Sequence, residues 1–126
     1  MYDMCFACGK DNPISLGLKF DLIDNNKVKA IFSPKEEHQG YEGIVHGGIV
    51  STLLDEAMVS AIVAKGSEAV TAELKIRFKD SIKVGEELHI FGYISKEKSK
   101  MICTEGEIRN KEGQLKARGE AKFMLV

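Results

Sequence analysis

A long apolar segment near the middle of the chain constrains the fold more than any other feature. Residues 47–65 contain no proline, and their only glycines stand at the start, before apolar residues that recur at helical spacing. Gly66 follows, as is typical just beyond a helix C-terminus. So much of the circumference of this predicted helix is apolar that other elements must wrap around it, since a surface helix shows a wider polar face. A curved sheet would provide this cover.

The rest of the chain supplies strands for such a sheet. Residues 70–78 have the clearest two-residue period, with apolar side chains at one set of positions and Thr71, Glu73, Lys75 and Arg77 at the other. Further strands are expected at residues 16–23, 28–32, 86–95, 100–109 and 114–125. Residues 33–43 and 96–99 are expected to be a loop and a turn. The predicted fold class is α+β, an antiparallel β-sheet wrapped around one long central helix.

Length and charge limit the domain organisation and the partners. The 126 residues, 44% of them hydrophobic, suffice for one sizeable core, so residues 1–126 are expected to form a single domain. Eighteen basic and 19 acidic residues give a net charge of −1, so we expect no nucleic-acid or membrane partner. Residues 1–10 lack a signal-peptide pattern, and no apolar stretch is long enough to cross a bilayer. We therefore expect a cytoplasmic protein.

The three cysteines include a C-x-x-C pair, Cys5 and Cys8. An odd number without an export signal indicates reduced thiols rather than a disulfide framework. Such a pair can be half of a zinc site or a redox pair, but a structural zinc needs four ligands, and no βαβ pattern surrounds the pair. The other candidate ligands are scattered: His38, His46, His89 and Cys103. We predict no metal site and interpret the pair as small buried residues.

The start of the predicted helix is the first candidate for chemistry. His46-Gly47-Gly48 runs directly into it, so the backbone N–H groups of Gly47, Gly48 and Ile49 are its unpaired first donors. Glycine lets a ligand approach the backbone closely, and the positive end of the helix dipole favours a negatively charged oxygen. The pattern predicts a site for a developing oxyanion. The alternative is a helix that needs small residues to enter a crowded core.

Asp55 and Glu56 are the second candidate, because a carboxylate in a buried helix is costly unless it is paired or used. Consecutive helical residues point about 100° apart, so only one faces inward, and we predict that Asp55 does and that Glu56 is the surface member. Asp55 lies about 12 Å along the helix from Gly47, too far for both to act on one carbonyl. Two antiparallel helices across a two-fold axis would bring them together, which predicts a homodimer with two shared sites.

These segments, with Leu53-Leu54-Asp55-Glu56-Ala57 and the strand at residues 70–75, resemble the HGG-containing acyl-CoA thioesterases of the hotdog superfamily, a group similar to the phenylacetate-pathway thioesterase. The resemblance runs from about Cys5 to the C-terminus. It implies the hotdog fold, dimers joined edge to edge and often paired into tetramers, and hydrolysis of an acyl-CoA thioester without a cofactor, coenzyme A being part of the substrate. It also implies catalytic roles. Gly47, with Gly48 beside it, would bind the thioester oxygen, His46 would shape the loop, and Asp55 of the partner would be nucleophile or general base.

The remaining substrate contacts are expected around this core. Many relatives carry asparagine six residues before the histidine, where this chain has Gly40, and Gln39 is expected to position water or the carbonyl instead. Lys75, Arg77 and Lys79 are predicted to bind the phosphates of coenzyme A, the alternative being a solvated strand face. The predicted substrate-binding residues are Gln39, Val45, Thr71, Lys75 and Arg77.

Three other functions compete with hydrolysis. A hotdog module that binds acyl-CoA without turnover would leave Asp55 without a purpose. A hotdog dehydratase or hydratase uses an Asp/His pair placed differently from the one here. A structural interaction protein would leave a buried carboxylate unexplained. Aryl, short-chain and medium-chain acyl groups are all compatible with the sequence, because a small change in pocket size alters which chain fits.

Overall fold

The apolar segment forms a single long helix. In the computed structural model, which describes residues 2–126, α1 spans Gly47–Val63. Gly66 follows with φ 88°, in agreement with the predicted end of the helix. Side chains on several sides of α1 are fully buried: Leu53, Leu54, Ala57, Met58, Ala61 and Ile62. The expectation that other elements wrap around this helix is therefore confirmed.

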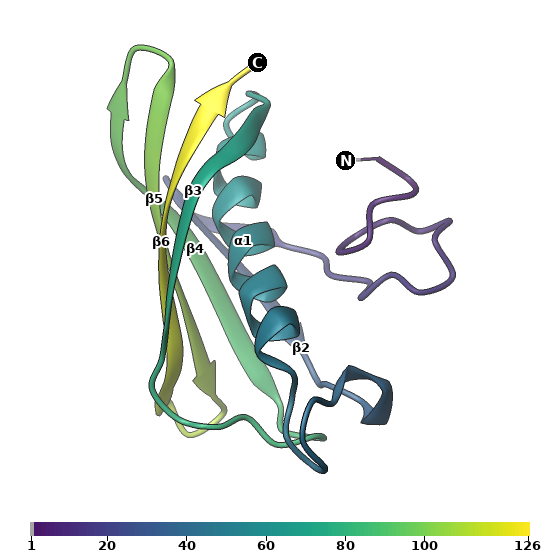
Figure 1. The fold of residues 1–126 in the computed structure, drawn as a ribbon. Helices are drawn as coiled ribbons and strands as arrows, with labels where there is room; N and C mark the ends of the chain where they lie inside the picture. The colour runs from purple at the N-terminus through teal and green to yellow at the C-terminus, as the bar shows by residue number, and fades with distance from the viewer. Residues whose placement is uncertain (1) are drawn as a thin grey trace.

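The six strands form one antiparallel sheet. Their bounds are Asp21–Asp24 (β1), Lys27–Phe32 (β2), Ala69–Phe78 (β3), Leu88–Lys98 (β4), Met101–Asn110 (β5) and Leu115–Leu125 (β6), and a short 3-10 helix covers Glu36–His38. The order across the sheet is β1-β2-β4-β5-β6-β3, with α1 lying along one face (Figure 1). This is the hotdog arrangement that the resemblance implied, and the predicted fold class is confirmed. Among residues 2–126, no helix is long and apolar enough to span a membrane.

The N-terminal segment covers the side of α1 that faces away from the sheet (Figure 1). Ala7, Leu16 and Leu18 belong to the core, and backbone hydrogen bonds join Leu16 to Phe6 and Leu18 to Ala7. The first strand therefore begins only at Asp21, not at residue 16 as the alternation suggested. The alternating leucines pack on the helix instead of joining the sheet.

The expected turn at residues 96–99 is shorter in the structure. β4 continues to Lys98, with a bulge between Ile94 and Lys96, and Lys98 pairs with Met101. Ser99 takes the left-handed conformation, φ 43°, in the tight turn that remains. The charged residues 96–98 suggested a turn, but they lie on the exposed end of β4. Strand pairing through the backbone does not require apolar side chains there.

Three glycines lie side by side across the sheet where α1 packs on it. Gly92 of β4 is opposite Gly106 of β5, which is opposite Gly119 of β6. A Cβ atom at Gly92 would collide with the carbonyl oxygen of Ala57 in α1. The row of glycines therefore sets how closely the helix approaches the sheet.

Replacing Gly92 by alanine is expected to lower the free energy of unfolding by about 3 kcal/mol, since the added methyl group must displace the helix backbone. Denaturant unfolding followed by circular dichroism measures this loss. Gly119→Ala is the matched control, because its Cβ would lie 3.1 Å from the flexible ends of Ile76 and Met58, and we expect a loss below about 1 kcal/mol. If both variants lost the same free energy of unfolding, the close packing of α1 on Gly92 would not explain the effect.

One edge of the sheet is left open. β3 pairs with β6 on one side and with no other strand among residues 2–126. Val70 and Phe78 are each 56% exposed along this edge, and Leu74 is 39% exposed. An exposed edge strand with apolar side chains is a template for pairing with another chain, and folded proteins usually cover it. The open edge lies beside the candidate site described next.

Candidate active site

Hydrogen bonds stabilise the loop that precedes α1. The Gln39 side chain accepts a hydrogen bond from the Gly43 N–H and donates one to the Glu36 carbonyl, so this residue holds the loop together. Val45 is buried, and its N–H donates to the Ile82 carbonyl at 2.8 Å. These two predicted substrate-binding residues thus fix the loop before the helix, and their contact with a substrate stays a prediction.

His46 caps the helix. Its Nδ1 atom accepts a hydrogen bond of 2.8 Å from the Gly48 N–H, as expected of an N-cap side chain. Because Nδ1 is the acceptor, the proton of the neutral imidazole lies on Nε2. The His46 N–H donates in turn to the His38 carbonyl. The imidazole is engaged in holding the helix start, which agrees with the loop-shaping role that the resemblance implied.

The first-turn amides differ from the sequence-based expectation of three free donors. The Gly48 N–H is bonded to His46, and the Ile49 N–H donates to the His46 carbonyl at 2.9 Å. Within residues 2–126 the Gly47 N–H alone in this first turn finds no acceptor. The prediction is therefore wrong for Gly48 and Ile49, because the histidine cap uses them. One amide, at the positive end of α1, is left for an oxyanion.

Gly47 lines a surface hollow between the helix start and the end of β3. Phe78, Lys79 and Val50 contribute to the same hollow. A Cβ atom at Gly47 would lie 3.6 Å from the Phe78 ring, an ordinary contact distance. The free amide thus lies in a recess beside the C-terminal end of β3, next to the open edge of the sheet.

Asp55 lies at the other end of β3. Its Oδ1 atom accepts a hydrogen bond of 2.9 Å from the Thr71 hydroxyl, and the side chain is partly buried. Burial raises the pKa of the Asp55 carboxyl, and the hydrogen bond from Thr71 lowers it in part. Asp55 is therefore held in one orientation, by a residue that was predicted to contact the substrate.

A bulge explains how Thr71 reaches the helix. Strict alternation places Thr71 on the same face as Glu73, Lys75 and Arg77, but the register of β3 against β6 shifts between Thr71 and Glu73. Thr71 consequently lies opposite the fully buried Phe123, on the helix side of the sheet. The extra residue reverses the side on which the strand presents its side chains. The predicted alternation is therefore wrong on the N-terminal side of the bulge, where Val70 lies opposite the exposed Met124 on the outer face.

Glu56 is the more deeply buried of the two adjacent carboxylates. It is 7% exposed, whereas Asp55 is partly buried. The assignment of Glu56 to the surface is therefore wrong, because the N-terminal segment covers the helix face on which it lies. Burial raises the pKa of the Glu56 carboxyl, and a hydrogen bond with Cys8 lowers it in part.

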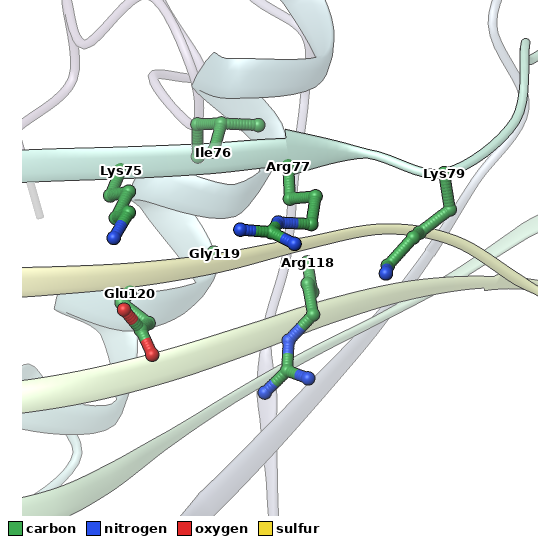
Figure 2. A pocket seen from close by; sticks show the side chains of 7 residues that line it. All are labelled: Lys75, Ile76, Arg77, Lys79, Arg118, Gly119 and Glu120. Atoms are coloured by element: carbon green, nitrogen blue, oxygen red, sulfur yellow. The ribbon is translucent and has the colours of Figure 1, made fainter.

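The predicted phosphate-binding residues lie on the outer face of the sheet. Figure 2 shows the Arg77 and Arg118 side chains next to each other, with Lys75 and Lys79 to either side. Arg77 of β3 pairs directly with Arg118 of β6. Like charges directly opposite each other are unfavourable unless an anion lies close to them. The Glu105 carboxylate forms an ion pair of 3.5 Å with Arg118, whereas Arg77 has no ion pair among the described residues. Arg118 was missed in the sequence because only the strand register brings it beside Arg77.

Within one chain the candidate site residues therefore lie in two groups, at opposite ends of β3. The Gly47 amide and Lys79 lie at one end, and Asp55 with Thr71 lies at the other. Eight residues of α1 separate Gly47 from Asp55, a rise of about 12 Å. A single chain does not place both on one carbonyl group.

Comparison with known proteins identifies the family to which this chain belongs. Residues 42–117 match the family described as the thioesterase superfamily. Human acyl-coenzyme A thioesterase 13 is 29% identical over 106 residues, which cover 80% of this chain and 76% of the relative. Zebrafish thioesterase superfamily member 2 superposes with a TM-score of 0.81 at 26% identity, covering 94% of this chain and 87% of that one.

A further solved structure carries a bound ligand. It is a hypothetical thioesterase of Streptococcus pneumoniae with coenzyme A, with a TM-score of 0.81 at 19% identity over 86% of this chain and 88% of that one. At this identity the likeness concerns the fold. The family match extends over more than half of the chain and includes α1, β3, β4 and β5. The helix has an amide without an acceptor among residues 2–126 at its start and a carboxylate in its middle. On the strength of the family match, the chain belongs to the thioesterase superfamily.

Proposed function

We propose that this protein hydrolyses an acyl-CoA thioester to the free acid and coenzyme A. The observation that carries the proposal is the Gly47 N–H, left free at the positive end of α1 in a recess next to the basic outer face. A backbone donor at that place stabilises the oxyanion that forms when a thioester carbonyl is attacked. The human and zebrafish relatives named as thioesterases support this reading.

The proposed active unit is a homodimer joined through β3. The half-site around Gly47 lies at the C-terminal end of this strand, and Asp55 with Thr71 lies at its N-terminal end. Antiparallel pairing of two β3 strands about a two-fold axis near Leu74 would bring the Gly47 end of one chain to the Asp55 end of the other. It would also cover the open edge and its exposed apolar side chains. Two such dimers would form the tetramer expected from the resemblance.

The proposed chemistry uses one group from each chain. The Gly47 N–H binds the thioester oxygen, while the partner's Asp55 either attacks the carbonyl carbon or removes a proton from the attacking water. The oxyanion then collapses, the carbon–sulfur bond breaks, and coenzyme A leaves with the sulfur and takes up a proton. If Asp55 is the nucleophile, the acyl–aspartyl anhydride that remains is hydrolysed by water, which breaks the acyl–aspartate bond and restores the carboxylate. In either role of Asp55, water supplies the second oxygen of the acid. Thr71 keeps the Asp55 carboxyl in position throughout.

Lys79 connects the reacting centre to the proposed phosphate site. It lines both the recess beside Gly47 and the basic hollow on the outer face. A thioester held at Gly47 could therefore extend past Lys79 toward the paired Arg77 and Arg118, where its phosphates would relieve the repulsion between the two guanidinium groups. The coenzyme A bound to a protein of the same fold supports this proposal.

Charge reversal in the basic hollow is expected to weaken substrate binding without slowing the chemical step. Arg77→Glu and Arg118→Glu should each raise KM for an acyl-CoA by about tenfold or more and leave kcat within about twofold. The matched substrate is the same acyl group on N-acetylcysteamine, which lacks the phosphates, and its kcat/KM should not change. An equal loss on both substrates would show that the arginines do not bind phosphate.

The proposed activity is tested with a panel of aryl, short-chain and medium-chain acyl-CoA thioesters. Release of free coenzyme A is followed with a thiol reagent that absorbs after reaction, and the acid is identified by mass spectrometry. Turnover of at least one thioester, with the acid and thiol formed in equal amounts, is the expected result. Binding of the thioesters without turnover of any would replace hydrolysis by the acyl-CoA-binding function.

A further inference from the structure

A second cluster of reactive side chains lies on the far side of α1 from the sheet. The Sγ atoms of Cys5 and Cys8 and a carboxylate oxygen of Glu56 all lie within 4.8 Å of one another. The cysteines come from the N-terminal segment and the glutamate from the helix. Thr71 and the open edge of the sheet are not part of this cluster, and the proposed hydrolysis does not use it.

One oxygen of the carboxylate in this cluster has no hydrogen-bond partner among the described residues. Glu56 is 7% exposed, and its Oε2 atom is buried without a hydrogen-bond partner among the described residues. Buried polar atoms are almost always paired, and an unpaired carboxylate oxygen is costly. A cation bound between these groups would pair with the Glu56 oxygen and stabilise the charged forms of all three side chains.

The backbone holds the two thiols on the same side of a tight turn. The Gly9 N–H donates to the Cys5 carbonyl at 2.8 Å, and the Asp11 N–H donates to the Asp3 carbonyl at 2.8 Å. A Cβ atom at Gly9 would collide with the backbone of Asp3 and Cys5. Only glycine allows this close turn. The C-x-x-C spacing is therefore built into a preformed loop, as in the halves of known zinc sites.

We propose that Cys5, Cys8 and Glu56 bind a zinc ion that fastens the N-terminal segment to α1. Two thiolates and a carboxylate suit Zn²⁺, whereas Mg²⁺ and Ca²⁺ prefer sites made of oxygen ligands. Zinc is tetrahedral, so water takes the fourth position in this site. The sequence-based prediction of no metal site did not consider Glu56, which lies 48 residues after Cys8 in the sequence. A Cys5–Cys8 disulfide would leave the buried Glu56 oxygen without a partner.

The experiment titrates Co²⁺ into reduced, metal-free full-length protein. Thiolate-to-cobalt charge-transfer absorption should saturate at one ion per chain, and Zn²⁺ should displace the cobalt and raise Tm. Cys8→Ser and Glu56→Gln should weaken binding by factors of about 100 and about 10, respectively. Cys103→Ser is the matched control, because Cys103 lies on β5 outside the cluster, and it should bind as the wild type does.

A second measurement requires no variant. Zinc should slow alkylation of Cys5 and Cys8 and leave Cys103 equally reactive, as read by peptide mass spectrometry. The proposal is overturned by binding below about a tenth of an ion per chain. It is also overturned by unchanged affinity in Glu56→Gln, or by a Cys5–Cys8 disulfide in protein isolated without air. Hydrolysis of acyl-CoA is measured separately, and its failure would not affect the zinc titration.

Discussion

Replacing Asp55 by asparagine or alanine is expected to lower kcat/KM for an acyl-CoA thioester by a factor of about 100 or more. Asparagine fills the same space and can still accept the hydrogen bond from Thr71. It can neither attack a carbonyl carbon nor take a proton from water, so the substitution removes the carboxylate chemistry in both roles that the sequence leaves open. Thiol release measures the loss at matched protein concentration.

Two controls separate this loss from a change in folding or assembly. Asp21→Asn replaces an exposed carboxylate on β1, far along the sheet from β3, and should keep kcat/KM within about twofold. Light scattering and thermal unfolding must show the same oligomer and a similar Tm for the wild type and Asp55→Asn. If folded Asp55→Asn keeps activity within about tenfold of the wild type, Asp55 has no part in the chemical step.

Thr71→Val tests the positioning of this carboxylate. Valine has nearly the same shape but no hydroxyl, so Asp55 loses the one side-chain hydrogen bond that it makes among residues 2–126. The expected loss in kcat is smaller than that of Asp55→Asn, about tenfold, because the carboxylate remains. This smaller effect would distinguish a residue that positions the carboxylate from one that reacts.

The helix and the strand with a clear periodicity of apolar residues were predictable from the sequence, whereas the irregularities within strands were not. The helix was placed to within two residues of its observed end at Val63, and the strand at 70–78 starts one residue earlier in the structure. The bulge that turns Thr71 toward Asp55 leaves no trace in the pattern of apolar residues. Bulges depend on the pairing register with a partner strand, in this case β6, which a single strand does not encode.

The burial of Glu56 was missed for a similar reason. A helix wheel shows that Asp55 and Glu56 face different directions, but it does not show what covers each one. Here the sheet ends near Asp55, and the N-terminal segment closes over Glu56. In the same way, the contact between the Gly92, Gly106 and Gly119 row and α1 follows from strand pairing across the sheet. Sequence patterns describe single elements well and contacts between distant elements poorly.

The second large effect is expected from Gly47→Pro, which removes one N–H group. Gly47 is the first helical residue, where proline is well accommodated, and His46 before it has φ −58° and ψ 135°, as a residue preceding proline requires. We expect kcat to fall by a factor of about 100 to 1,000, the usual effect of losing an oxyanion donor. Gly47→Ala keeps the N–H, and its Cβ would meet Phe78 at an ordinary 3.6 Å, so it should lose far less. Similar losses in folded Gly47→Ala and Gly47→Pro would show that the amide is not the donor.

Mixing the two inactive variants tests whether the site is shared between chains. In a dimer of one Asp55→Asn chain and one Gly47→Pro chain, a shared arrangement gives one site with an intact Gly47 and an intact Asp55, and one site with neither. Random exchange makes about half of the dimers mixed, so about a quarter of the wild-type activity should return after refolding the two together. If each site were contained within one chain, every site would lack either the Gly47 N–H or the Asp55 carboxylate, and no activity would return. Since α1 holds Gly47 and Asp55 of one chain about 12 Å apart, recovery would show that each active site takes these two residues from different chains.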